Sequence, residues 1–308
     1  MKRFGLEGVE SFIPGMKSCI DQLLEDGCRK VIIGMPHRGR LNMLANVVRK
    51  PLETIFAEFQ GVMPSKDGEH DFGQKSGDVK YHLGTSYKRK YGNGKEMTIE
   101  ILANPSHLEC INPVVMGKVR SEQHYSGQGN NTKRNAIVPI LIHGDAAFSG
   151  QGVVYEQMGM MNLQNYTVGG TIHVIVNNQI GFTTVPSKGR SNVYSSDLAK
   201  AFDAPIFHVN ADSMEDVHFV FKMAAAFRQK FNRDVVIDLI GYRKMGHNEL
   251  DQPSFTQPLM YKQVDKMVPV ARLYEKELLE KGVLSKEVIK SMKDFIQTTF
   301  EEAYIKSK

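Results

Sequence analysis

A carboxylate and an amide follow two neighbouring apolar runs in the middle of the chain. Asp145 comes shortly after residues 137–143 (IVPILIH), and Asn178 follows residues 171–176 (TIHVIV), 33 residues further on. This separation fits one strand–helix–strand unit, whose parallel strands would place both side chains at the same edge of a sheet. Carboxylate and amide oxygens suit a hard cation such as Mg²⁺, which uses few protein carboxylates and completes its shell with phosphate oxygens and water.

The spacing of these two residues therefore indicates a Mg²⁺ ion that holds a diphosphate. The backbone N–H groups of Ala146 and Ala147 would face the phosphate oxygens at the turn into the next helix. Taken singly, Gly-Asp before a helix and Asn-Asn after a strand are each often simple turns. Their combination, with a strand before each, favours the cation site.

Histidines and one arginine follow other predicted strands or glycine-bounded turns. His37 and Arg38 lie in MPHRGRLN, His82 in YHLG and His107 in NPSHLE. Loops at such positions deliver side chains to the ligand-binding edge of a sheet. An arginine with several histidines can bind the carboxylate of an oxo acid and move protons near neutral pH. His247, in GHNE after the last predicted strand, fits this group equally well as it fits a helix cap.

Histidines inside the predicted strands have a structural interpretation instead. His143, His173 and His208 each fall within a strand. We expect these imidazoles to be held by hydrogen bonds within the fold rather than to take part in chemistry.

The elements that must position these residues are short apolar runs that alternate with helical segments. The runs are nearly continuous, which is typical of strands covered on both faces. The alternation predicts an α/β fold with a parallel sheet and helices on both faces. The predicted strands are residues 30–34, 97–103, 137–143, 171–176, 206–209 and 235–240. The predicted helices are residues 15–26, 41–49, 52–59, 150–163 and 214–231.

Two stretches interrupt this alternation, and it stops near the end of the chain. Residues 61–94 are rich in Gly, Lys, Asp and Ser and are predicted to form a long loop, and residues 125–135 a surface loop. After residue 258 the pattern is helical and charged. We therefore expect an α/β domain at residues 1–258, which binds the diphosphate and Mg²⁺, and a helical extension at residues 259–308.

Composition excludes several classes of protein. The formal net charge of +5, from 39 basic and 34 acidic residues, is too small to indicate nucleic-acid binding. No apolar run approaches the length of a membrane span. The three cysteines, with no CxxC spacing, do not predict a disulfide framework.

Seven ordered segments resemble the decarboxylating first component of 2-oxoglutarate dehydrogenase complexes, a thiamine diphosphate-dependent family. They are MPHRGRLNML, SGDVKYHLG, NPSHLE, HGDAAFSGQGVVYE, VIVNNQIGFTT, APIFHVNAD and YRKMGHNELDQPSFTQPLMY. Asp145 and Asn178 match the family's cofactor motif, Gly-Asp-Gly followed about thirty residues later by Asn-Asn. Ala146 stands where the generic motif has its second glycine.

The resemblance implies a transketolase-like diphosphate-binding fold and a role for each matching position. The implied Mg²⁺ ligands are Asp145, Asn178 and the carbonyl of Ile180. The implied contacts with thiamine diphosphate are these three residues together with Arg38, Ser106, Leu108, Ala146 and Ala147. The implied substrate contacts are Arg38, His82 and Ser106. The implied catalytic histidines are His37, His82, His107 and His247. Ser106, Leu108 and Ile180 rest on the resemblance alone.

The resemblance also implies an activity, partners and a location. The reaction is the decarboxylation of 2-oxoglutarate in the tricarboxylic acid cycle, with succinyl transfer to a lipoyl group of the succinyltransferase component. Dihydrolipoyl dehydrogenase completes the complex, and the full-length component is a homodimer. The family acts in the mitochondrial matrix of eukaryotes and in the cytoplasm of bacteria.

Family members are much longer than this chain and continue into a pyrimidine-binding domain. We therefore expect this chain to be a partial enzyme that is inactive alone. Two alternatives stay open. One is 2-oxoadipate dehydrogenase, a relative that shares nearly all these motifs, and the other is a non-catalytic cofactor-binding piece.

Overall fold

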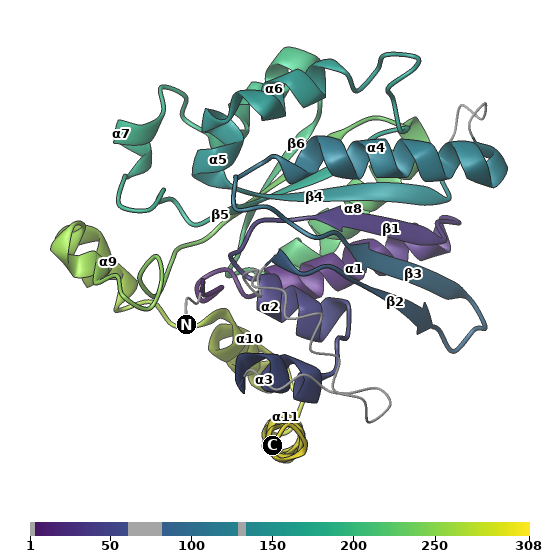
Figure 1. Ribbon diagram of the computed structural model, residues 1–308. Coiled ribbons are helices and arrows are strands. Elements are labelled where there is room, and N and C mark those ends of the chain that lie inside the picture. Colours follow the sequence, from purple (N-terminus) through teal and green to yellow (C-terminus); the bar gives the residue numbers. More distant parts are fainter. Residues whose placement is uncertain (1–3, 61–81, 129–133) are drawn as a thin grey trace.

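Seven strands form one sheet with the order β2-β3-β1-β4-β5-β7-β6 (Figure 1). The computed structural model describes residues 4–60, 82–128 and 134–308. Neighbouring strands are parallel throughout the sheet except β2 and β3, which are antiparallel. The strands are β1 (Lys30–Gly34), β2 (Thr85–Lys90), β3 (Glu96–Ile101), β4 (Ile137–Gly144), β5 (Ile172–Asn177), β6 (Ile206–Asn210) and β7 (Val235–Ile240).

Helices cover both faces of this sheet, as the apolar pattern predicts. Helices α1 and α8 lie on one face, and α4, α5 and α6 on the other (Figure 1). Alternate side chains of β1 enter different cores: Val31 and Ile33 join the cluster under α1 and α8, and Ile32 joins the cluster under α4. The longer helices are α1 (Phe12–Glu25), α3 (Leu52–Gln60), α4 (Ile111–Gln123), α6 (Gly152–Gly159), α8 (Met214–Phe231), α10 (Val270–Glu280) and α11 (Lys286–Lys306). The shorter ones are α2 (Arg40–Asn42), α5 (Asp145–Gly150), α7 (Pro186–Gly189) and α9 (Pro258–Val264).

The sheet changes direction of winding next to β1. Strand β1 pairs with β3 on one side and with β4 on the other, so the chain crosses over β1 between those two strands. In open α/β sheets, loops that leave the carboxyl ends of strands diverge at such a point and leave a crevice. The segments that begin at Pro36 and at Asp145 leave the sheet on either side of this point. The crevice expected for a ligand therefore lies between β1 and β4.

All six predicted strands are present, with ends that differ from the prediction by at most two residues. The prediction of a loop at residues 61–94 is wrong for part of its length, because β2 and the start of a hairpin to β3 lie there; residues 61–81 of that stretch lie outside the described residues. Strand β2 is an edge strand whose side chains alternate between half-buried and exposed. Its many polar residues therefore hide the apolar pattern by which a strand is predicted. The surface loop predicted at residues 125–135 also lies partly outside the described residues.

Two helix predictions need correction, and one helix was missed. The helix predicted at residues 150–163 is the shorter α6, and α5 is a separate helix before it, because Gln151 between Gly150 and Gly152 is extended. The helix predicted at residues 41–49 is α2 followed by a π-helix, Met43–Val47. Helix α4 was not predicted, because Pro113 lies near its start. A proline is tolerated there, since the N–H groups of the first turn have no partner within the helix.

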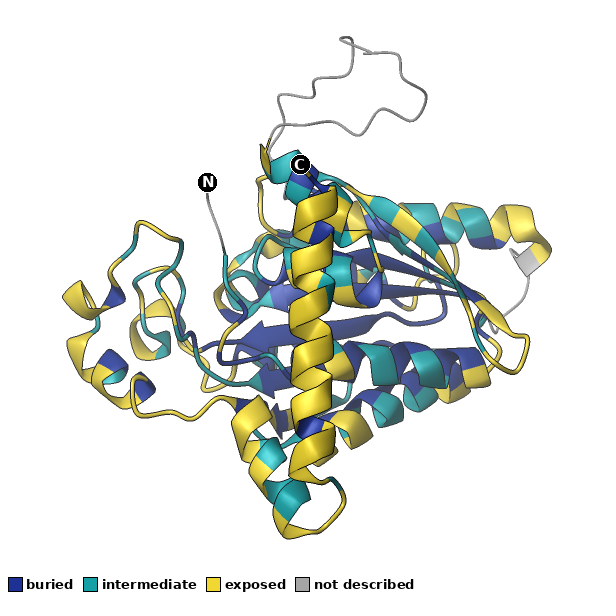
Figure 2. Cartoon of the chain, turned by 90° about the horizontal axis from the view of Figure 1, so that it is seen from below, coloured by how far each residue is buried: buried dark blue, intermediate teal, exposed yellow. Residues whose placement is uncertain are grey.

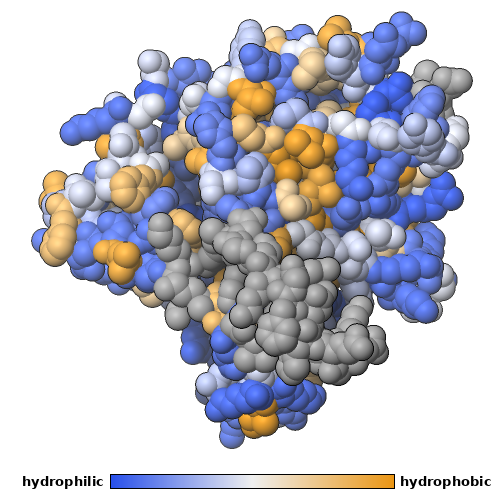
Figure 3. All heavy atoms as spheres, viewed as in Figure 1, coloured by the Kyte–Doolittle hydropathy of each residue, from blue (hydrophilic) through white to orange (hydrophobic). Residues whose placement is uncertain are grey.

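The end of the chain is helical, as expected after residue 258. Helix α11 is exposed along most of its length and packs against α3 (Figure 2). The face of the molecule seen in Figure 3 is largely hydrophilic, with small hydrophobic areas. Within the described ranges, no helix has the length and apolarity needed to cross a membrane.

Arg228 ties α8 to the amino ends of the strands. Its side chain is fully buried, and its guanidinium donates hydrogen bonds to the carbonyls of Gly170 (2.9 Å), Val168 (2.9 Å) and Arg134 (3.2 Å). The Gln123 side chain also donates to the carbonyls of Val168 (2.9 Å) and Arg134 (3.4 Å), and the loss of a donor to a buried carbonyl is costly. The guanidinium therefore holds three loop carbonyls at the edge of the sheet opposite to the crevice.

Arg228→Met should lower the free energy of unfolding by about 2–4 kcal/mol, since it removes three hydrogen bonds from a buried guanidinium to these carbonyls. Urea denaturation followed by circular dichroism measures this change. The matched control is Lys230→Met, two residues along the same helix at an exposed position, which should stay within about 0.5 kcal/mol of the wild type. A cost below about 1 kcal/mol for Arg228→Met would contradict this role.

Candidate functional site

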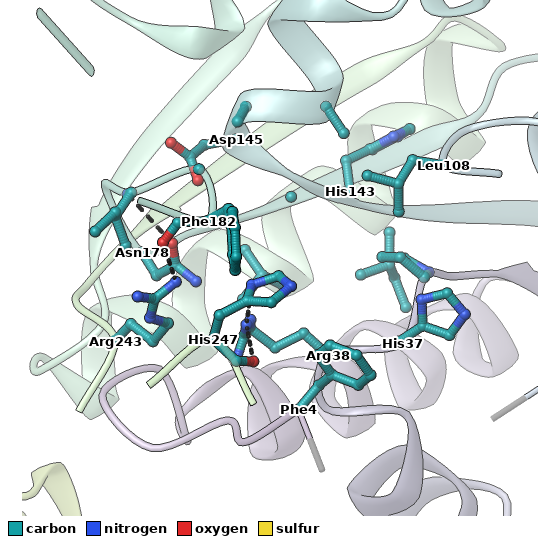
Figure 4. A pocket seen from close by; sticks show the side chains of 18 of the residues that line it. Phe4, His37, Arg38, Leu108, His143, Asp145, Asn178, Phe182, Arg243 and His247 are labelled. Carbon is teal, nitrogen blue, oxygen red and sulfur yellow. Dashed lines mark hydrogen bonds between the residues drawn. The ribbon is translucent and has the colours of Figure 1, made fainter. Parts of the chain in front are cut away.

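A pocket of about 310 Å³ opens at the edge where the parallel strands end (Figure 4). The segments that follow β1, β3, β4, β5 and β7 all contribute to its wall. Most of the predicted site residues line it. They are His37, Arg38, Ser106, Leu108, Asp145, Ala146, Ala147, Asn178, Ile180 and His247. The other two, His82 and His107, do not.

Asp145 and Asn178 lie on one side of this pocket (Figure 4). Asp145 is 3% exposed and begins α5, while Asn178 is 7% exposed and follows β5. Burial raises the pKa of Asp145 above its usual value, and the Arg190 guanidinium, 3.4 Å from the carboxylate, offsets this only in part. A buried carboxylate whose pKa stays raised beside this guanidinium would be stabilised further in its ionised form by a metal ion.

The loop after β5 is held in a tight conformation that turns its backbone toward Asp145. Gln179 and Phe182 have positive φ angles of 60° and 52°. The Asn178 side chain accepts a hydrogen bond from the N–H of Ile180 (3.3 Å). A Cβ on Gly181 would lie 2.7 Å from the Cβ of Ala146, so the two loops touch and only glycine fits at this position.

The donor set fits Mg²⁺ with a diphosphate better than it fits a fully protein-bound metal. Within the described ranges, no group of three or more His, Cys, Asp or Glu side chains could hold a metal. Asp145 offers one carboxylate, Asn178 one amide oxygen, and the Ile180 segment backbone carbonyls. Mg²⁺ is typically bound by one or two carboxylates and phosphate oxygens in this way.

Arg38 provides a fixed positive charge on the opposite side of the pocket. Its guanidinium donates to the carbonyl of Gly5 (2.9 Å) and to the carbonyl of His247 (3.0 Å), which prevents it from swinging away. Burial and the nearby Arg243 lower the pKa of Arg38 to about 10, so it stays charged at neutral pH. The Arg38 guanidinium can therefore pair with a carboxylate or a phosphate on this side of the pocket.

Two imidazoles beside this arginine are kept neutral. Burial and the guanidinium groups of Arg38 and Arg243 lower the pKa of His247 to about 4. Burial, followed by His82 and Arg40, lowers the pKa of His37. A neutral imidazole can both donate and accept a hydrogen bond, so each ring can contact a polar group of a ligand at neutral pH.

The two predicted residues outside the pocket differ in their distance from it. His82 lies behind the wall: its ring centroid is 5.4 Å from that of His37, and its Nε2 is 3.1 Å from the hydroxyl of Ser106. It therefore touches two residues that line the pocket. His107 is exposed and makes no part of the wall.

The structure adds pocket residues that sequence reasoning missed. Phe4 lies 5.5 Å from His37 and 5.4 Å from His247, between ring centroids, and Phe182 lies 4.5 Å from His247. Arg243 lines the pocket and donates to the carbonyl of Phe182 (2.9 Å). His143, predicted to be purely structural, also lines the pocket. The sequence gives one indication of a role for Arg243, which is its position in the loop after the last strand, two residues before Met245.

The fold and the site define an open α/β domain with a pocket, lined by charged and polar side chains, at the carboxyl edge of its sheet. The chain belongs to the family described as "Dehydrogenase E1 component", whose pattern matches residues 1–308. Proteins of this family are in general dependent on thiamine diphosphate.

Individual relatives carry a more specific name. The "2-oxoglutarate dehydrogenase, mitochondrial" of Dictyostelium discoideum is 52% identical over 303 residues, which cover 98% of this chain and 29% of the relative. That of Saccharomyces cerevisiae is 52% identical over 307 residues, covering 100% of this chain and 30% of the relative. A "2-oxoglutarate dehydrogenase-like, mitochondrial" protein of Rattus norvegicus is 50% identical over 308 residues, with shares of 100% and 30%. The chain thus spans about 30% of the length of these relatives.

The low pKa of His247 predicts a pH-dependent loss of stability. Between its pKa in the folded protein, about 4, and the usual value of 6.5, the unfolded chain binds more protons than the folded one, so stability falls as the pH is lowered through this range. His247→Gln should make the fall between pH 7 and pH 4.5 smaller by about 1 kcal/mol, a discounted value because the ring is only half-buried. Urea denaturation at both pH values measures it.

The matched control for this experiment is His124→Gln, an exposed imidazole. Its pH dependence should equal that of the wild type. An unchanged fall in the His247 variant would mean that this ring is protonated in the folded protein.

Proposed function

We propose that this chain forms the diphosphate- and Mg²⁺-binding part of a thiamine diphosphate-dependent enzyme that decarboxylates 2-oxoglutarate and transfers the succinyl group to a lipoyl group. The observation that supports it most directly is the pairing of Asp145 and Asn178 at one end of a pocket with Arg38 and two neutral histidines at the other. The whole activity is proposed for the protein that contains this chain, given that relatives are more than three times as long.

The cation side of the site would be built by residues after β4 and β5. Asp145, Asn178 and the carbonyl of Ile180 would hold Mg²⁺, and the backbone N–H groups of Ala146 and Ala147 would donate to the diphosphate. Thiamine diphosphate, when bound, supplies the electron sink that a 2-oxo acid needs to lose CO₂. The close approach of Gly181 to Ala146 would keep the metal-binding loop and the diphosphate-binding turn in register.

The substrate side would be built around Arg38. Its charge would pair with a carboxylate of 2-oxoglutarate, and Ser106 with His82 would support the same end of the substrate. His37 and His247, neutral at pH 7, would each donate a hydrogen bond from the ring nitrogen that carries the proton, Nδ1 or Nε2, as charge develops on the keto oxygen. Phe4 and Phe182 flank these rings and would limit the access of water. His107, which is exposed, would act only at the rim.

Partners and location follow from the same proposal. The lipoyl-bearing succinyltransferase component and dihydrolipoyl dehydrogenase would receive the product in sequence, within a homodimeric first component. The relatives above carry the word mitochondrial in their names, which favours the matrix if the source is a eukaryote. Rates of CO₂ release from 2-oxoglutarate and 2-oxoadipate, measured on the protein that contains this chain, test the substrate.

Asp145→Asn should weaken the binding of Mg²⁺ with thiamine diphosphate at least 100-fold, a difference of about 2.7 kcal/mol. The amide has the same shape but lacks the charge, and it removes the cost of burying a carboxylate, so the melting temperature of the ligand-free protein should not fall. Isothermal titration calorimetry and differential scanning calorimetry measure the two quantities. Asp203→Asn, an exposed aspartate, is the control; an affinity for Asp145→Asn within threefold of wild type would refute the assignment.

Arg38→Ala should raise KM for 2-oxoglutarate at least tenfold while the Kd for thiamine diphosphate changes less than threefold, because the guanidinium lies on the wall opposite Asp145. Arg38→Lys, which keeps the charge but not the fork of donors, should give an intermediate KM. Steady-state kinetics and calorimetry separate the two effects. An equal loss of cofactor affinity in both variants would place Arg38 on the diphosphate instead.

A further inference from the structure

A chain of four buried polar side chains starts at the wall of the pocket and runs away from it through the sheet. Glu109 Oε2 lies 2.6 Å from His143 Nδ1, and His143 Nε2 lies 3.0 Å from His173 Nδ1. His173 Nε2 lies 3.2 Å from Asp234 Oδ2. None of the four is more than 5% exposed. One end of this chain, Glu109 and His143, therefore lies beside the pocket, and the other end lies at the amino edge of the sheet.

Glu109 is unusual in both its side chain and its backbone. Its carboxylate accepts a hydrogen bond from the Asn112 side chain (2.6 Å) in addition to its contact with His143. Although burial opposes ionisation, His143 and Asn112 hold the pKa of Glu109 below its usual value. Its φ of 69° is in the left-handed region, which costs a non-glycine residue about 1 kcal/mol or more. Such a conformation persists only where surrounding contacts enforce it.

The loop that carries Glu109 has few other contacts, one of which places the Ser106 hydroxyl 3.1 Å from His82 Nε2. Residues 105–108 are all exposed, yet Ser106 and Leu108 form part of the pocket wall. Of the residues just before it, Asn104 donates its backbone N–H to the carbonyl of His82 (2.8 Å). Glu109 is thus the buried attachment that follows the wall-forming residues, and it joins them to β4 two residues before Asp145.

We propose that Glu109 is a positioning residue, which holds Leu108 and Ser106 in the pocket wall by anchoring their loop to His143 at the end of β4. This inference rests on the proposed function, since the ligand in question is Mg²⁺ with thiamine diphosphate. Glu109 itself does not line the pocket. Its effect on the ligand passes through the loop on one side and through the strand that leads into Asp145 on the other.

Glu109→Gly and Glu109→Gln test this role on the protein that contains this chain. Glycine accepts the left-handed backbone without strain, so this variant removes the anchor without adding backbone strain. Glutamine can accept from His143 Nδ1 through its oxygen, and its amide can donate to Asn112 Oδ1, which has no hydrogen-bond partner in the structure. The Kd for Mg²⁺ with thiamine diphosphate should rise at least tenfold for Glu109→Gly and stay within threefold of wild type for Glu109→Gln.

Asp234→Asn is the matched control. Asp234 is a buried carboxylate of the same series of four hydrogen-bonded side chains, at the end remote from the pocket. This variant should lower the melting temperature and leave the Kd within threefold of wild type. If Asp234→Asn and Glu109→Gly weaken binding equally, the effect is one of general stability and the proposal fails. The proposal also fails if Glu109→Gly binds like wild type, or if Glu109→Gln binds as poorly as Glu109→Gly.

A measurement without ligand separates this inference from the proposed function. The hydrogen-bonded backbone amides of Asn104, Cys110 and Asn112 should exchange hydrogen at least tenfold faster in Glu109→Gly than in wild type, with β7 unchanged. If wild type does not bind Mg²⁺ with thiamine diphosphate, the proposed function fails, and the exchange rates still decide whether Glu109 anchors the loop. Should Glu109→Gly not fold, Asn112→Ala removes one of the two contacts of Glu109 and should raise the Kd at least threefold; an unchanged Kd overturns the proposal.

Discussion

The parallel alignment of β1, β4 and β5 is the constraint on which the pocket depends. Because these strands run in the same direction and in register, the residues that follow them emerge at one edge. His37 and Arg38 leave the sheet after β1, Asp145 after β4 and Asn178 after β5, although they are far apart in sequence. The crossover of the chain at β1 then separates the loops enough to leave a cavity between them. An antiparallel arrangement would have sent alternate loops to opposite edges.

The charged side chains around the pocket add an electrostatic preference to the site that the strand order creates. Arg38, Arg190 and Arg243 surround the region near the buried carboxylate of Asp145. This fixed positive charge attracts an anionic ligand, and burial together with Arg38 and Arg243 keeps His247 neutral. A bound diphosphate with its cation would balance these charges. Ligand binding and the protonation of His247 are therefore coupled, because any ligand that neutralises the guanidinium groups also makes this imidazole easier to protonate.

The sequence predicts the parallel core and most of the pocket because both depend on local patterns. Continuous apolar runs identify the buried strands, and the polar residues directly after them identify the ligand edge. Strand β2 escapes this reasoning because it is an exposed edge strand rich in Lys and Arg, and α4 because proline obscures its start. Glu109 escapes it for a different reason: its partner, His143, is 34 residues away, and only the folded sheet brings them into contact.

The contact between Gly181 and Ala146 links two loops that are otherwise independent in sequence. The space between them accommodates one methyl group, and in this chain residue 146 supplies it. In the generic form of the motif a glycine stands at the position of Ala146, so the same space would be open from that side. The two positions should therefore covary across homologues: a relative with glycine at the first can carry alanine at the second, whereas alanine at both would force the loops apart.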